Sequence, residues 1–243
     1  MFVSETYYAG GYWGPRKEGP EDCAQRLERF LKGLPTADPS LARWYETAKT
    51  MEASLKRPLR PAHDELTRFI RKNRDPVFED IGFHIGGWNG EAKAHEDCGF
   101  LIRCGSYDAR TVNRCVFNLP RPGTSAAHVL SASVLSNMLR ETAAAWEPDW
   151  GVAMSHEHRD KVEAGRIARS PYVGWVTYLA QHRGTVPPLP APVRIEKVED
   201  KGTLIVLTPE RFTASNPEHL ALAERVRELL DGAGLLNPLH VEP

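Results

Sequence analysis

The residue types best suited to chemistry occur together in the cluster His156-Glu157-His158. Two imidazoles at alternate positions of a strand lie on the same face, where they could bind a metal ion. His182 or Glu147 could complete the coordination of such a site. However, the cluster follows a predicted strand and opens a charged segment. We therefore interpret it as an exposed polar loop and keep a metal-dependent hydrolase as an alternative.

Two further groups have the composition of an active site. Glu199-Asp200-Lys201 combines the acids that hold Mg²⁺ in metal-dependent nucleases with a lysine that could steady water, but it lies in a predicted hairpin turn. Cys104 could act as a nucleophile, yet nothing in the sequence activates it, so we expect a buried thiol. The chain also contains no P-loop and no G-x-G-x-x-G, H-E-x-x-H or G-x-S-x-G motif. The sequence therefore predicts that the protein is not an enzyme and needs no cofactor.

The composition is typical of a globular protein. Hydrophobic residues make up 41% and charged residues 26% of the 243 positions. The net charge of -1 gives no overall attraction to nucleic acid or to an anionic membrane. The N-terminal residues do not have the pattern of a signal peptide, and no apolar stretch approaches the ~18 residues of a membrane span. The four cysteines form no C-x-x-C pair, so we expect a soluble protein in the reducing cytoplasm.

The first part of the chain predicts one strand followed by a helical region over about 20–73. Aromatic residues favour a strand over the first ~15 residues, with a bend at Gly10-Gly11. Pro20 opens the first helix, and Asp38 followed by proline predicts a second helix that includes Trp44. A third helix is expected after Pro61, where apolar residues have helical spacing.

The middle part, over about 78–180, predicts a sheet and one long helix. Strands over 81–90, 100–107 and 112–119 are separated by turn residues, which is typical of an antiparallel meander. A long helix is expected from Thr124-Ser125 to Trp146. Two more strands follow, over 150–154 and 172–179.

The last part follows a rigid proline-rich connector, residues 187–192. Residues 193–235 predict a hairpin and a helix, which could not bury a core of their own. We therefore expect residues 1–243 to form a single α+β domain. It would have a mainly antiparallel sheet with N-terminal helices, one long central helix and a C-terminal helix packed on it.

Aromatic and acidic residues supply the candidates for protein binding. Aromatic side chains at glycine-rich loop edges could anchor an interface, and acids near them would complement a basic partner. The candidate binding residues are Tyr12, Trp13, Trp88, Glu91, Asp97 and Asp149. Core packing of the aromatic residues and a solvated acidic surface remain open alternatives. The helical region, residues 16–75, has 14 basic against 10 acidic residues, so a nucleic-acid-binding module is a further alternative.

Four runs of sequence, rich in glycine and aromatic residues, carry a family resemblance. They are 7–18 (YYAGGYWGPRKE), 86–90 (GGWNG), 101–107 (LIRCGSY) and 146–155 (WEPDWGVAMS). In this order they resemble the immunity protein 52 family of bacterial polymorphic toxin systems.

The resemblance implies an inhibitor that binds a secreted toxin and protects the producing cell and its kin. It implies delivery of that toxin by a contact-dependent or type VI apparatus, and a toxin domain similar to restriction endonucleases. The expected partner is thus one toxin domain per chain, without a membrane or nucleic acid.

Overall fold

One antiparallel sheet runs through the computed structural model, which describes residues 5–239. Within these residues nine strands lie in the order β2-β3-β4-β5-β1-β6-β7-β9-β8. The strands are β1 (Tyr7–Trp13), β2 (Tyr45–Glu46), β3 (Phe83–Trp88), β4 (Gly99–Cys104), β5 (Asn113–Asn118), β6 (Trp150–Ser155), β7 (Val176–Ala180), β8 (Arg194–Val198) and β9 (Gly202–Val206). The hairpin β8–β9 pairs with β7, so the chain after the proline-rich connector extends the same sheet.

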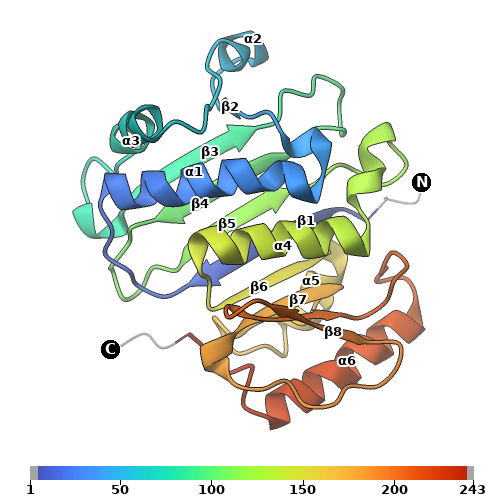
Figure 1. Cartoon of the computed structure of the whole chain (residues 1–243). Helices are drawn as coiled ribbons and strands as arrows, with labels where there is room; N and C mark the ends of the chain where they lie inside the picture. Colours follow the sequence, from blue (N-terminus) through green and yellow to red (C-terminus); the bar gives the residue numbers. More distant parts are fainter. Residues whose placement is uncertain (1–4, 240–243) are drawn as a thin grey trace.

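Two helices cover one face of this sheet. The α-helices are α1 (Pro20–Ala37), α2 (Met51–Leu55), α3 (His63–Lys72), α4 (Ala132–Trp146), α5 (His156–Glu163) and α6 (Pro217–Gly232). Figure 1 shows α1 and α4 side by side in front of the central strands, with α5 and α6 beside the β6–β8 end of the sheet. None of the helices within residues 5–239 is long and apolar enough to cross a membrane.

The core between these helices and the sheet is strongly aromatic. Acids in the first turn of α1 suit the positive end of the helix dipole, and the apolar stripe of α1 faces the sheet. Phe30 of this stripe lies 5.5 Å from the Phe117 ring and 6.1 Å from the Trp146 ring. Trp146 stacks on Trp13 of β1 with ring centroids 5.7 Å apart, and both indoles are buried. Aromatic contacts therefore join α1, α4, β1 and β5.

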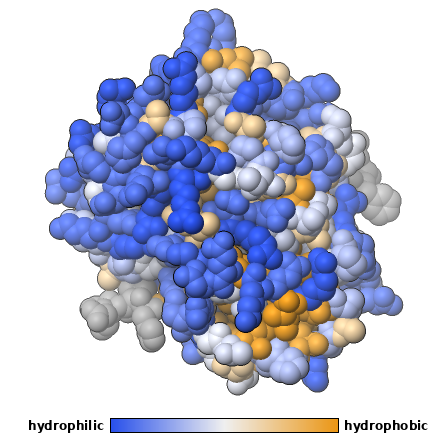
Figure 2. All heavy atoms as spheres, viewed as in Figure 1, coloured by the Kyte–Doolittle hydropathy of each residue, from blue (hydrophilic) through white to orange (hydrophobic). Residues whose placement is uncertain are grey.

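The outer surface of this helical face is mostly hydrophilic. Figure 2 shows charged and polar side chains over α1 and α4, and a hydrophobic area over β8. In β8 Ile195 is 45% exposed, while Arg194 and Lys197 of the same strand are also exposed. Charged residues on an edge strand discourage unwanted pairing with other chains.

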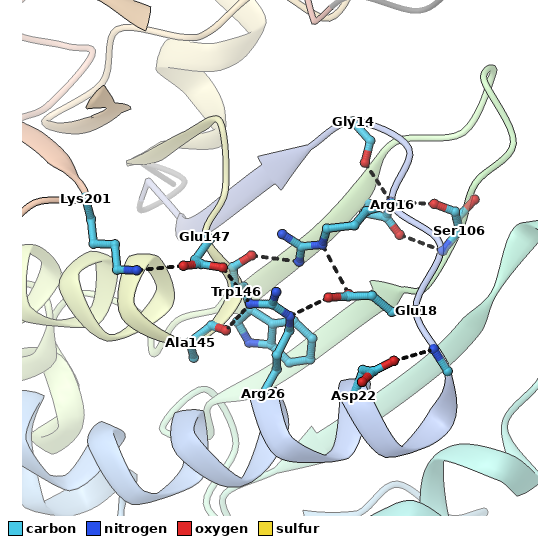
Figure 3. A network of polar contacts seen from close by, with 12 residues as sticks. Gly14, Arg16, Glu18, Asp22, Arg26, Ser106, Ala145, Trp146, Glu147 and Lys201 are labelled. Carbon is cyan, nitrogen blue, oxygen red and sulfur yellow. Dashed lines mark hydrogen bonds and ion pairs between the residues drawn. The ribbon is translucent and has the colours of Figure 1, made fainter. Parts of the chain in front are cut away.

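A polar network ties the C-terminal hairpin to the N-terminal helix (Figure 3). The Glu18 carboxylate lies 3.1 Å from Arg16 Nε and 2.6 Å from Arg26 Nε. Arg26 also lies 3.1 Å from Glu147, whose other oxygen is 2.6 Å from Lys201 Nζ. These contacts connect the β1–α1 loop, α1, the end of α4 and the β8–β9 turn.

The predicted α+β class, the antiparallel meander and the C-terminal hairpin and helix are confirmed. The predicted second helix is wrong. A single 3-10 turn (Pro39–Leu41) is followed by β2, which forms a sheet edge against β3. Trp44 explains the difference, because its ring is buried 4.8 Å from the Phe100 ring and its Nε1 donates to Leu41 O. Tertiary packing and edge pairing thus outweigh a local helical pattern.

The long central helix begins later than the sequence indicates. Residues Ser125–Val129 form a 3-10 turn, and α4 starts only at Ala132. The Ser131 hydroxyl accepts a hydrogen bond from Val134 N at 3.4 Å and caps the helix.

Candidate interaction surface

The face of the sheet opposite α1 and α4 is open across β3, β4 and β5, whereas the residues of β1 on this face are buried or half-buried. Burial alternates along β3, β4 and β5, so every second side chain points away from the core. The strand registers align the outward residues in three rows across the sheet. The basic row is His84, Arg103, Arg114, Tyr12 and Trp150; the middle row is Gly86, Leu101, Val116 and Gly10; the third row is Trp88, Gly99, Asn118 and Tyr8. We call these rows together the open face.

The middle row forms an apolar trough. Leu101 is 54% exposed and Val116 is half-buried. Of the glycines at the two ends of the row, Gly86 is half-buried and Gly10 is buried beside Val116 and the Tyr12 hydroxyl. Two cavities of about 440 and 330 Å³ open here, and both are lined by Leu101 and Asn118. Met51 of α2 borders the smaller cavity and is itself exposed. The two cavities thus meet at Leu101 and Asn118, and each is large enough to receive side chains of a partner.

The basic row holds a surplus of positive charge, which Asp75 offsets only at the end formed by His84 and Arg103. Arg103 and Arg114 are direct cross-strand partners on the same face, and like charges in this position destabilise a sheet. Arg103 Nε donates to His84 Nε2 at 2.8 Å, whereas the Arg114 side chain has no ion pair or hydrogen bond among residues 5–239. Burial and then the Arg114 charge lower the pKa of Arg103. Burial and then the Arg103 charge lower the pKa of His84.

Aromatic rings form the β1–β6 side of the open face. Tyr12 stacks on Trp150 with centroids 4.2 Å apart and an angle of 20°. Burial raises the pKa of Tyr12 to about 12, so its hydroxyl stays protonated at neutral pH. Tyr8 lies 4.9 Å from the His156 ring. The rings of this side are thus packed against neighbouring rings, and the Arg159 guanidinium lies 5.9 Å from the centroid of Tyr8.

Three more arginines border the larger cavity, namely Arg159, Arg166 and Arg169. Arg159 pairs with Asp160 at 2.7 Å, and Arg166 pairs with Glu163 at 3.2 Å. Arg169 donates to the Arg110 carbonyl at 2.8 Å. The acids neutralise the charges of Arg159 and Arg166, whereas Arg169 is held by backbone carbonyls and adds to the positive character of the rim.

The sequence candidates do not form one cluster. Tyr12 and Trp88 lie on the open face, but in different rows. Trp13 is 2% exposed and stacked on Trp146, so the expectation that it lies at an exposed loop edge is wrong. Its strand directs it to the helical face, next to α4.

The acidic candidates lie at opposite ends of the strands. Asp149 precedes β6 at the basic-row end, where its carboxylate accepts from Gly14 N at 2.9 Å and lies 2.8 Å from His182 Nε2. Glu91 and Asp97 follow Trp88 in the β3–β4 turn. The end of the sheet near Asp149 and the β3–β4 turn are separated by four residues along a strand and by four strand spacings. This corresponds to a distance on the order of 20 Å. The three acids therefore do not form one acidic face, and contact of each with a partner stays a prediction.

The basic row itself was not among the sequence candidates. The sequence signal that could have identified them is alternation: His84, Arg103 and Arg114 alternate with buried residues on three predicted strands. Their alignment depends on the strand registers, which the turns between the strands determine.

The histidine cluster opens α5 instead of forming a loop. Residues two apart on a helix point in nearly opposite directions. His156 accordingly faces Tyr8, whereas His158 is buried and stacks on Phe212 at 4.8 Å. Within residues 5–239 no three His, Cys, Asp or Glu side chains come together as a possible metal site.

His158 is expected to make stability depend on pH. Burial lowers the pKa of His158 to about 4, against about 6.5 in an unfolded chain. The neutral ring is therefore stabilising above pH 6.5, and this stability is lost as the pH falls towards 4, by about 3 kcal/mol in total. Urea unfolding between pH 4 and 7 should show this loss for the wild type and less of it for His158→Phe. Parallel pH profiles for the two proteins would contradict the assignment.

The other two chemical candidates have structural roles. Lys201 N donates to Val198 O at 2.8 Å in the predicted hairpin turn, while Lys201 Nζ pairs with Glu147. Cys104 is fully buried, as expected, and burial raises the pKa of its thiol well above the usual range. A protonated, inaccessible thiol is a poor nucleophile.

Comparison with known proteins places this chain in a family. The model of immunity protein 52 matches residues 5–239, and the chain belongs to this family. The solved structure of the Pseudomonas aeruginosa T6SS protein PA0821 is similar, with a TM-score of 0.52 and 14% sequence identity. The match covers 94% of this chain and 74% of that chain, and at this identity it shows a shared fold. Comparison with curated proteins finds no significant sequence match.

Proposed function

We propose that this protein is an immunity protein that binds and neutralises a cognate secreted toxin and thereby protects the cell that makes it. The observation that carries the proposal is the family match over residues 5–239. The open face supports it, because an inhibitor needs a rigid scaffold and an accessible complementary surface.

The finer features of the proposal follow from the same family. We propose that one chain binds one toxin domain in the cytoplasm, without a catalytic step, and that the toxin has a nuclease-like fold. The similar Pseudomonas aeruginosa structure is that of a T6SS protein, which supports delivery by a type VI apparatus.

The alternatives find less support. A hydrolase at the histidine cluster is disfavoured because His156 and His158 face different surroundings. Nucleic-acid binding through the N-terminal helices is disfavoured because many of their basic side chains have acidic partners. The paired residues are Arg16, Arg26, Lys32, Lys56, Arg71, Lys72 and Arg74.

The proposal is tested by growth of a susceptible strain that expresses the toxin domain encoded beside this protein. Co-expression of this chain should restore growth, whereas an unrelated immunity protein at equal abundance should not. Equal killing with and without this chain would contradict the proposal.

A further inference from the structure

We infer that the open face binds an acidic segment of the cognate toxin, with carboxylates received by Arg103 and Arg114. The inference rests on the proposed function and deepens it, since it names both the surface and the chemistry of the partner. It also reverses the charge that the sequence suggested for the interface.

The first argument is the charge of the basic row. A protein gains nothing in stability by placing two arginines directly opposite each other on neighbouring strands. Arg114 is exposed, and no side-chain partner is found for it among the described residues. A bound carboxylate would compensate both guanidinium groups, because arginine donors match carboxylate oxygens in geometry.

The second argument is the shape beside that charge. The trough next to the basic row has an apolar floor formed by Leu101 and Val116. Apolar surface left exposed in a hollow and rimmed by polar residues is typical of a protein-binding site. The occupant should therefore be a peptide segment that carries both acidic and apolar side chains.

The third argument separates a protein partner from a nucleic acid. Single-stranded nucleic acids bind basic surfaces by stacking bases on accessible aromatic rings. Here Tyr12 is already stacked on Trp150, and Trp150 is only 3% exposed. Carboxylates can reach the exposed Arg114 without displacing either ring.

The decisive variant is Arg114→Glu. It places opposite charges on a cross-strand pair with Arg103, so the thermal midpoint should stay unchanged or rise slightly. It should nevertheless weaken toxin binding by about 100-fold or more, because it presents a negative charge to an acidic segment. Retained stability with lost affinity is an outcome that a purely structural role of Arg114 would not give.

Three further variants provide the comparison. Arg68→Glu changes the net charge equally on exposed α3, away from the open face, and should change affinity less than about threefold. Ile195→Lys alters the hydrophobic area on β8 and should likewise leave affinity unchanged. Arg103→Gln removes one guanidinium without reversing its charge and should weaken binding by about 10-fold.

Binding of each variant to the purified toxin domain and to a single-stranded DNA 20-mer would be measured by calorimetry at two salt concentrations. We expect the wild-type affinity for the toxin to fall with salt more steeply than that of Arg114→Glu. Three results would each overturn the inference. Arg114→Glu could bind the toxin with wild-type affinity, or only Ile195→Lys could lose affinity. The third is DNA binding that depends on Arg114 while toxin binding does not. In these cases the wild type still binds the toxin, so the proposed function stands, whereas it fails if the wild type binds no toxin.

Discussion

Trp13→Ala is expected to lower the free energy of unfolding by about 4 kcal/mol, because it removes a large side chain from a packed core. The Trp13 indole is 2% exposed and lies 5.7 Å from the Trp146 ring, between the sheet and α4. In a chain of this length the loss corresponds to a fall of roughly 10 °C in the thermal midpoint. Calorimetric or urea unfolding would measure it.

Trp88→Ala is the matched control, since Trp88 is half-buried on the open face and should cost roughly 1 kcal/mol. A Trp13→Ala protein with the wild-type midpoint but without toxin affinity would place Trp13 in the interface, against this structure. Weak protection by Trp13→Ala in cells should instead follow the fraction of folded protein.

Glu18→Gln is expected to lower the free energy of unfolding by about 2 kcal/mol. The change leaves Arg16 and Arg26 without the carboxylate that lies between them, and the Glu18 side chain is only 10% exposed. Removing one partner of a fully buried ion pair would lower the free energy of unfolding by more than this. Because both arginines are partly solvated, we expect the smaller value. Unfolding in urea at neutral pH would measure the change.

The control for Glu18→Gln is Glu21→Gln in the first turn of α1. Glu21 pairs with Arg71 on the surface, and such pairs contribute little. Equal midpoints for both variants would show that the contacts of Glu18 in Figure 3 do not stabilise the fold.

Much of the fold could be predicted from local patterns. Alternating apolar residues and turn dipeptides identified β3, β4 and β5, and the proline after Asn216 marked the start of α6. The region after Asp38 was mispredicted because Trp44 has helical spacing from Leu41 while its ring is fixed by distant phenylalanines. Long-range packing of this kind leaves no trace in the local sequence.

The interaction surface was harder to predict than the fold. Trp13 sits beside glycines, as a loop residue would, but its neighbour Trp146 is far along the chain. Arg103 and Arg114 each look like ordinary outward residues of a strand, and only the register makes them opposite partners. The family resemblance gave the partner class, while the charge of the surface came from the geometry of the sheet.

The most direct test of the account is a calorimetric titration of the purified chain with the toxin domain encoded beside it. We predict one toxin domain per chain and a dissociation constant on the order of nanomolar or below. No detectable complex at micromolar concentrations of both folded proteins would contradict the claim that this protein acts by binding its toxin.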